Sequence, residues 1–177
     1  MANNTLITGG ARSGKSRFAE ELTRGFGPSL CYLATAQPLD DEMGERIHRH
    51  QLRRGTAWET LEEPLMIPQT LARIDGIYSA ILLDCVTLWL SNLLLSCDEN
   101  DPGCEEQVLS HVHRLAGTLR GMSTPVVLVT NEVGQGIVPE TRLGRIYRDI
   151  AGQANQLLAA GCDAVYVTIS GIPLKLK

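Results

Sequence analysis

The chain has 177 residues, 44% of them hydrophobic, which is the size of one domain with a substantial core. Its formal net charge of -4 argues against the domain-wide basic excess of a dedicated nucleic-acid-binding protein. The first four residues contain no basic or long apolar leader, and no segment reaches the roughly 18 consecutive apolar residues of a membrane span. We therefore expect one cytoplasmic domain over residues 1–177, with a small-molecule partner, no nucleic acid and no membrane span.

Short apolar runs rich in β-branched residues alternate along the chain with longer segments of helical periodicity. This alternation predicts an α/β fold, with a mostly parallel sheet covered by helices on both faces. The predicted strands are Thr5–Thr8, Ser29–Ala34, Ala80–Leu83, Val126–Thr130 and Ala164–Thr168. A first predicted helix follows the glycine-rich segment after Thr8, and the others are Asp41–Arg54, Pro68–Ile74, Val86–Ser96, Cys104–Met122 and Arg142–Ala160. Residues 170–175 are expected to pair with the last strand as an antiparallel edge.

The segment after the first predicted strand fits the pattern G-x-x-x-x-G-K-[ST] of a phosphate-binding P-loop. Its residues are Gly9, Gly10, Ala11, Arg12, Ser13, Gly14, Lys15 and Ser16. A strand before it and a helix after it favour a P-loop over an ordinary glycine turn. Glycines let backbone N–H groups converge on phosphate oxygens, and the helix N-terminus adds its positive end. We expect Lys15 to act as the catalytic cation and Ser16 to hold Mg²⁺.

Other candidate site residues follow the later strands, because ligands of open α/β sheets bind beyond the carboxyl ends of the strands. Asp84 closes the apolar run Ile81–Leu83, and an apolar strand that ends in a carboxylate is typical of a Walker B position that binds Mg²⁺. The alternative is that Asp84 caps the helix that follows. Residues 130–136 form a polar, glycine-bearing segment that is suited to a substrate-binding loop.

The predicted helix Asp41–Arg54 combines histidines with many arginines. At 100° per residue, His50 shares a face with Arg54 and lies one turn after Arg46, whereas His48 points nearly the opposite way. The positive field of the arginines disfavours the imidazolium, so that a neutral, nucleophilic ring is available near pH 7. Such a ring can attack phosphorus while the arginines neutralise a triphosphate. A basic amphipathic helix is also typical of a solvated surface, and the spacing alone leaves that alternative open.

The cysteines indicate neither a disulfide framework nor a zinc site. They are odd in number, scattered and never in C-x-x-C spacing. We expect reduced, mostly buried thiols at Cys31, Cys85, Cys97, Cys104 and Cys162.

Taken together, these motifs resemble the family of bifunctional adenosylcobinamide kinase / adenosylcobinamide-phosphate guanylyltransferases over nearly the whole chain. The resemblance implies phosphorylation of the corrinoid adenosylcobinamide by ATP or GTP, and then transfer of GMP from GTP onto that phosphate with release of pyrophosphate. It also implies a GMP-histidine intermediate and a homotrimer. The residues that carry the resemblance are Thr8–Ser16, Tyr32–Ala36, Asp41–Met43 with Arg46, Ile47 and His50, Trp58–Glu62, Thr130–Gly134, Gly136–Pro139 and Ser170–Pro173.

The resemblance also implies roles for particular residues. The guanylylated histidine of the family lies in an Arg-Ile-x-x-His pattern, which selects His50 and leaves His48 as a bystander. Glu62 can accept the N1 and N2 protons of guanine, although without the family a surface glutamate is an equal alternative. The implied nucleotide contacts beyond the P-loop are Ala34, Thr35, Ala36, Gln51, Leu52, Arg53, Arg54, Glu62 and Asp84.

Two other functions are compatible with a P-loop in this chain. One is a small-molecule kinase without nucleotidyl transfer, and the other is a regulatory module that only senses a nucleotide. The arginine-flanked His50 favours an enzyme, because a switch has no use for a nucleophile there. For the kinase step, Asp84 and Glu132 are both candidates to orient the attacking hydroxyl, and the sequence does not rank them.

Overall fold

The structure is a computed structural model that describes residues 3–36, 57–98 and 101–177. The predicted helix Asp41–Arg54, and with it His50 and Gln51–Arg54, lies outside the described residues. The described strands are β1 (Thr5–Gly9), β2 (Leu30–Ala34), β3 (Trp58–Glu62), β4 (Ala80–Asp84), β5 (Val126–Val129), β6 (Ala164–Ile169) and β7 (Ile172–Lys175). The described helices are α1 (Lys15–Arg24), α3 (Ile67–Ile74), α4 (Val86–Ser96), α5 (Cys104–Gly121) and α6 (Arg142–Gly161).

These strands form a single seven-stranded sheet in the order β3-β2-β4-β5-β1-β6-β7. Every neighbouring pair is parallel except β6 and β7, which are antiparallel. The turn between β6 and β7 is tight, with Ser170 and Gly171 at φ angles of 51° and 83°. Two successive residues with positive φ are typical of a two-residue hairpin turn whose twist matches that of the strands. The predicted parallel sheet with an antiparallel edge near the C-terminus is thus confirmed.

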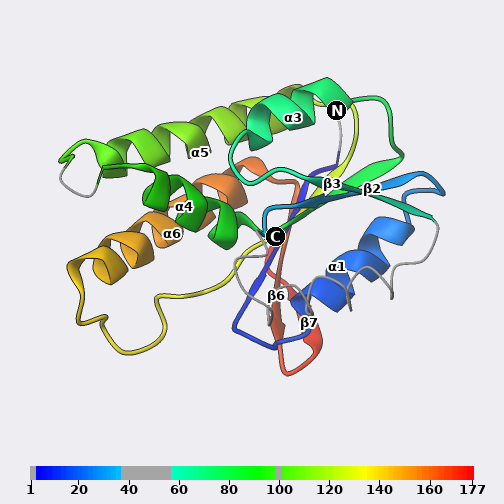
Figure 1. The fold of residues 1–177 in the computed structure, drawn as a ribbon. Helices are drawn as coiled ribbons and strands as arrows, with labels where there is room; N and C mark the ends of the chain where they lie inside the picture. The colour runs from blue at the N-terminus through cyan, green and yellow to red at the C-terminus, as the bar shows by residue number, and fades with distance from the viewer. Residues whose placement is uncertain (1–2, 37–56, 99–100) are drawn as a thin grey trace.

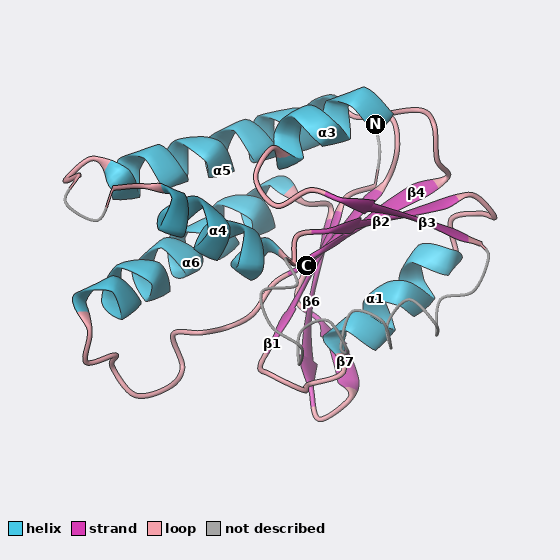
Figure 2. Cartoon of the chain, viewed as in Figure 1, coloured by secondary structure: helices cyan, strands magenta, loops and turns pink. Residues whose placement is uncertain are grey.

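Helices cover both faces of this sheet, as predicted (Figure 2). On one face, Leu33, Leu83 and Leu128 pack in a core with α3, α4, α5 and α6. On the other face, Tyr32 and Leu82 pack with α1. Strand residues alternate between the two cores because successive side chains of a strand point to opposite faces. Among the described helices, none is both long and apolar enough to cross a membrane.

Most predicted elements agree with the structure to within two residues, but β3 was not predicted as a strand. Its sequence contains two exposed glutamates, and only Trp58 is fully buried. It lies at the edge of the sheet and has one strand neighbour, β2. An edge strand of this kind lacks the continuous apolar run by which the central parallel strands were identified.

The apolar residues of α6 are not all buried. At helical spacing Leu143 and Leu157 share a face with Ile150 and Ala154, but Leu143 is exposed and Leu157 only partly buried. Figure 1 shows the N-terminal turns of α6 extending away from the sheet, where no strand covers them. The residues of α6 that are buried are Ile150, Ala151, Ala154, Asn155 and Leu158.

Candidate active site

The predicted P-loop connects β1 to α1, in the strand–loop–helix arrangement that phosphate binding requires. Gly14 precedes the helix with a φ of 93°, and Arg12 has a φ of 55°. The Lys15 ammonium folds back over the loop and donates a hydrogen bond to the Gly10 carbonyl, with an Nζ–O distance of 2.9 Å. Because Lys15 is only 9% exposed, the loop places a positive charge in a largely enclosed position beside its own backbone amides.

The end of β6 and the turn between β6 and β7 pack against the P-loop. The Gly171 amide donates a 2.8 Å hydrogen bond to the Ser13 carbonyl. A Cβ atom on Gly9 would lie 2.5 Å from the Thr168 carbonyl oxygen, and one on Gly14 would lie 3.1 Å from the Gly171 Cα atom. The loop therefore keeps its shape partly because these two positions carry no side chain.

Three of the predicted nucleotide contacts end neighbouring strands and are in register. Ala34 of β2 is the partner of Asp84 in β4 and of Glu62 in β3. The P-loop follows β1, which is two strands away from β4 with β5 between them, and it lies at the same edge of the sheet. The structure thus brings Glu62, Ala34, Asp84 and the P-loop to the carboxyl edge of one sheet, where ligands of this fold class bind.

Asp84 lies at the end of β4 and is half-buried. Its Oδ2 atom accepts a 3.1 Å hydrogen bond from the Tyr32 hydroxyl, a partner that the sequence did not predict. The N-cap residue of α4 is Cys85, so the alternative in which Asp84 caps that helix is wrong. Burial, and then the charge of Asp84, raises the pKa of Cys85 to about 11. The Cys85 thiol is therefore protonated at neutral pH and is a poor nucleophile.

Thr35 was predicted to contact the nucleotide, but in the structure its side chain connects two strands. Its side chain is fully buried, and its hydroxyl donates to the Cys85 carbonyl and accepts from the Cys85 amide, both at 2.8 Å. The hydroxyl therefore joins the ends of β2 and β4 inside the protein. Of the predicted segment Ala34–Ala36, only Ala36 is half-buried, and the other two residues are buried.

The predicted Mg²⁺ ligands, Ser16 and Asp84, are both half-buried oxygen donors. A hydroxyl and a carboxylate suit a hard cation, and Mg²⁺ takes most of its other ligands from water and from substrate phosphates. Across residues 3–36, 57–98 and 101–177, no group of three or more His, Cys, Asp or Glu side chains could hold a metal ion. The donor set fits Mg²⁺ bound together with a nucleotide rather than a metal held by protein alone.

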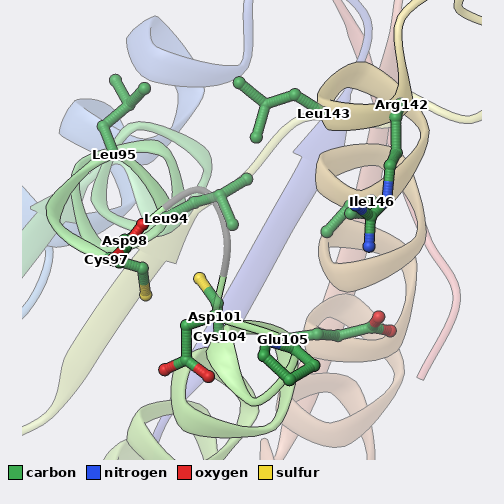
Figure 3. Close-up of a pocket in the computed structure, with 11 residues that line it drawn as sticks. Leu94, Leu95, Cys97, Asp98, Asp101, Cys104, Glu105, Arg142, Leu143 and Ile146 are labelled. Carbon is green, nitrogen blue, oxygen red and sulfur yellow. The ribbon is translucent and has the colours of Figure 1, made fainter.

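A pocket in the described part of the chain lies elsewhere, among α4, α5 and α6 (Figure 3). Leu94 and Ile146 line it, and so do the thiols of Cys97 and Cys104. Burial raises the pKa of Cys104 to about 12, and Cys97 and Asp101 add to that effect. None of the predicted site residues lines this pocket. The cysteines are all free, three of them buried and two half-buried, as expected.

Sequence analysis did not identify Asn155 of α6, which contacts the segment after β5. Its amide donates 3.2 Å hydrogen bonds to the Asn131 carbonyl and to Glu132 Oε1. Asn155 is 9% exposed and lies on the buried face of α6. A polar residue on an otherwise apolar helix face was the signal that could have found it, because buried polar groups need partners.

Comparison with known proteins agrees with the predicted resemblance. The chain matches, over residues 5–176, the family model described as cobinamide kinase / cobinamide phosphate guanyltransferase. The bifunctional adenosylcobalamin biosynthesis protein CobP of Pseudomonas aeruginosa is 45% identical over 174 residues, which cover 97% of this chain and 96% of that protein. The bifunctional adenosylcobalamin biosynthesis protein CobU of Salmonella typhimurium is 46% identical over 183 residues, covering 97% and 98%.

Among solved structures, the RadB recombinase aligns with a TM-score of 0.49 at 14% identity, over 93% of this chain and 73% of that chain. Family membership rests on the family model and on the curated relatives, which match nearly the whole length of the chain. This chain belongs to the cobinamide kinase / cobinamide phosphate guanyltransferase family.

Proposed function

We propose that this protein phosphorylates adenosylcobinamide with ATP or GTP, and then transfers GMP from GTP to adenosylcobinamide phosphate with release of pyrophosphate. The observation that carries the proposal is the P-loop at the carboxyl edge of the sheet, with the Lys15 ammonium held 2.9 Å from the Gly10 carbonyl oxygen. Both reactions need a triphosphate whose charge is neutralised. Family membership supports the corrinoid as the acceptor, since the relatives are named as bifunctional adenosylcobalamin biosynthesis proteins.

For GMP transfer, the proposed nucleophile is His50. A ring nitrogen forms a bond to the α-phosphorus of GTP, the bond to the bridging oxygen breaks, and pyrophosphate leaves. A phosphate oxygen of the corrinoid then attacks the same phosphorus, and the phosphorus–nitrogen bond breaks. Lys15, Arg53 and Arg54 would neutralise the phosphates in both displacements. Dividing the transfer in this way lets one nucleotide site serve a bulky second substrate.

The remaining predicted contacts complete the proposed nucleotide site. Mg²⁺ would be held by Ser16 and Asp84 and would neutralise charge on the triphosphate. The backbone of Gly9–Ser16 would bind the phosphates, and the exposed Glu62 carboxylate would accept protons from the guanine base. Ala36 and the segment Gln51–Leu52 would line the nucleoside, and the buried Ala34 and Thr35 would support Ala36 from within the sheet.

The test of this proposal is a covalent-adduct assay. Incubation with GTP labelled at the α-phosphate is expected to leave label on the polypeptide, and the label should be lost in acid as a phosphoramidate is. His50→Ala should abolish labelling because it removes the nucleophile. His48→Ala is the matched control and should label as the wild type does. Label that persists in the His50 variant would refute the assignment, and transfer of the γ-phosphate without any adduct would indicate a kinase alone.

We further propose that the protein is a cytoplasmic homotrimer. The outer strand β7 has one sheet neighbour, β6, and exposes apolar side chains, with Ile172 63% and Leu174 49% exposed. An apolar edge strand is a surface that another subunit can cover. Sedimentation equilibrium at micromolar protein is expected to give three times the chain mass of 19.3 kDa. A mass that stays at one chain across the concentration range would exclude the trimer.

A further inference from the structure

The segment that follows β5 lies between the two predicted phosphate-binding elements. In the sheet, β5 separates β1, which leads into the P-loop, from β4, which ends at Asp84. The Glu132 amide donates a 3.2 Å hydrogen bond to the carbonyl of Gly9, the first residue of the P-loop. Glu132 is therefore joined directly to the loop that would hold the triphosphate.

The Glu132 carboxylate is held in place through one of its oxygens. Its Oε1 atom accepts a 2.6 Å hydrogen bond from the Thr8 hydroxyl and a 3.2 Å hydrogen bond from the Asn155 amide. Within the described residues, Oε2 has no hydrogen-bond partner, and the side chain is half-buried. An anchored carboxylate with one oxygen left open can accept a proton from a bound substrate in a fixed geometry.

Asn155 in turn joins residues 130–132 to α6 through hydrogen bonds. Its Oδ1 atom accepts a 2.7 Å hydrogen bond from the Thr130 hydroxyl, and its amide group donates to the Asn131 carbonyl as well as to Glu132. The Asn131 side chain donates a 2.7 Å hydrogen bond to the Thr87 hydroxyl at the start of α4. The position of Glu132 is thus set by contacts from three elements, β1, α4 and α6.

We propose that Glu132 is the catalytic base of the kinase step and that Asn155 is the residue that positions it. The hydroxyl oxygen of the acceptor forms a bond to the γ-phosphorus, and the bond between that phosphorus and the β,γ-bridging oxygen breaks. The nucleoside diphosphate leaves, and the hydroxyl proton passes to Glu132 Oε2 and then to water. This inference rests on the proposed function, of which it assigns one residue.

Glu132 is better placed for this role than Asp84, the other candidate from the sequence. Asp84 already accepts a hydrogen bond from Tyr32 and is the proposed ligand of Mg²⁺. Glu132 contacts the P-loop itself, whereas Asp84 lies two strands away from β1. The GMP transfer needs no such base, because its acceptor is a phosphate oxygen that is already ionised. Glu132 therefore serves one of the two reactions and not the other.

The experiment measures both reactions separately on Glu132→Gln, with adenosylcobinamide phosphate supplied for the second. The amide keeps an acceptor for Thr8 and Asn155 but cannot take a proton. Its kinase kcat is expected to fall about 10²- to 10⁴-fold with the KM for the nucleotide unchanged, while GMP-adduct formation and GMP transfer persist. The exposed Glu140 belongs to the same loop, and Glu140→Gln is the control that should keep both activities.

Two further variants test the positioning of the carboxylate. Asn155→Ala removes one donor to Oε1 from α6, and Thr8→Val removes the other from β1. Each is expected to lower the kinase kcat by less than Glu132→Gln does, again without a change in the nucleotide KM. A general loss of folding would instead lower both activities and the thermal stability together.

The outcomes separate this inference from the function on which it rests. A wild-type protein with neither activity would overturn the proposed function. A wild type active in both reactions, with Glu132→Gln equally active as a kinase, would overturn the role of Glu132. Loss of both reactions to the same extent in a folded Glu132→Gln would also overturn it, since Glu132 would then only support the P-loop.

Discussion

Replacing Lys15 by alanine is expected to lower both the kinase and the GMP-transfer activity by about 10²- to 10³-fold in kcat/KM. The Lys15 ammonium is largely enclosed and lies against the Gly10 carbonyl of the P-loop. When a nucleotide binds, the Lys15 ammonium would turn from the Gly10 carbonyl to the phosphates and neutralise part of their charge. No other lysine lies in the loop. Steady-state kinetics with each acceptor supplied separately measure the two losses.

The matched control for this substitution is Arg73→Ala, which removes an exposed cation from α3. It should leave both activities at the wild-type level, because Arg73 lies in the last turn of α3, which leads into the start of β4 and not toward the carboxyl ends of the strands. If Lys15→Ala abolished one reaction and spared the other, the two reactions would not share a single nucleotide site. The proposal that one P-loop serves both reactions would then be wrong.

The structural features of the candidate site that the sequence predicted correctly are the strand–loop–helix around the P-loop and the strand that ends at Asp84, and both depend on local order. The P-loop is a contiguous pattern, and its geometry follows from Gly9, Gly14 and the helix that begins at Lys15. Asp84 was identified because an apolar strand ends there. Each of these signals lies within a few neighbouring residues, where the backbone rules are strong.

The parts that were missed depend on long-range contacts. Tyr32 and Asp84 are 52 positions apart and meet only because β2 and β4 are neighbours in the sheet. Thr8 and Glu132 are 124 positions apart, and Asn155 reaches the same carboxylate from a helix. Strand order decides these contacts, and periodicity within one segment carries no information about strand order. Strand β3 was missed for a related reason, since its place at the edge lets it be polar.

The second large effect is expected at Gly9, where alanine should weaken GTP binding by roughly 5- to 150-fold. Gly9 has a φ of 155°, and a Cβ atom there would lie 2.5 Å from the carbonyl oxygen of Thr168, its register partner in β6. Because the obstructing atom belongs to the backbone, the start of the P-loop must move away from β6. Holding a residue in such a strained arrangement costs about 1–3 kcal/mol, which corresponds to that loss of affinity.

Gly10 provides the matched comparison inside the same loop. A Cβ atom on Gly10 meets nothing within 4 Å, so Gly10→Ala should weaken binding by much less than Gly9→Ala. Calorimetric titration with GTP gives the two affinities, and thermal unfolding shows whether either protein has lost its fold. Equal losses for the two variants would contradict the argument, because the shape of the loop would then not depend on its packing against Thr168. A selective loss at Gly9 would instead show that β6, which contributes no predicted nucleotide contact, sets the geometry of the phosphate site.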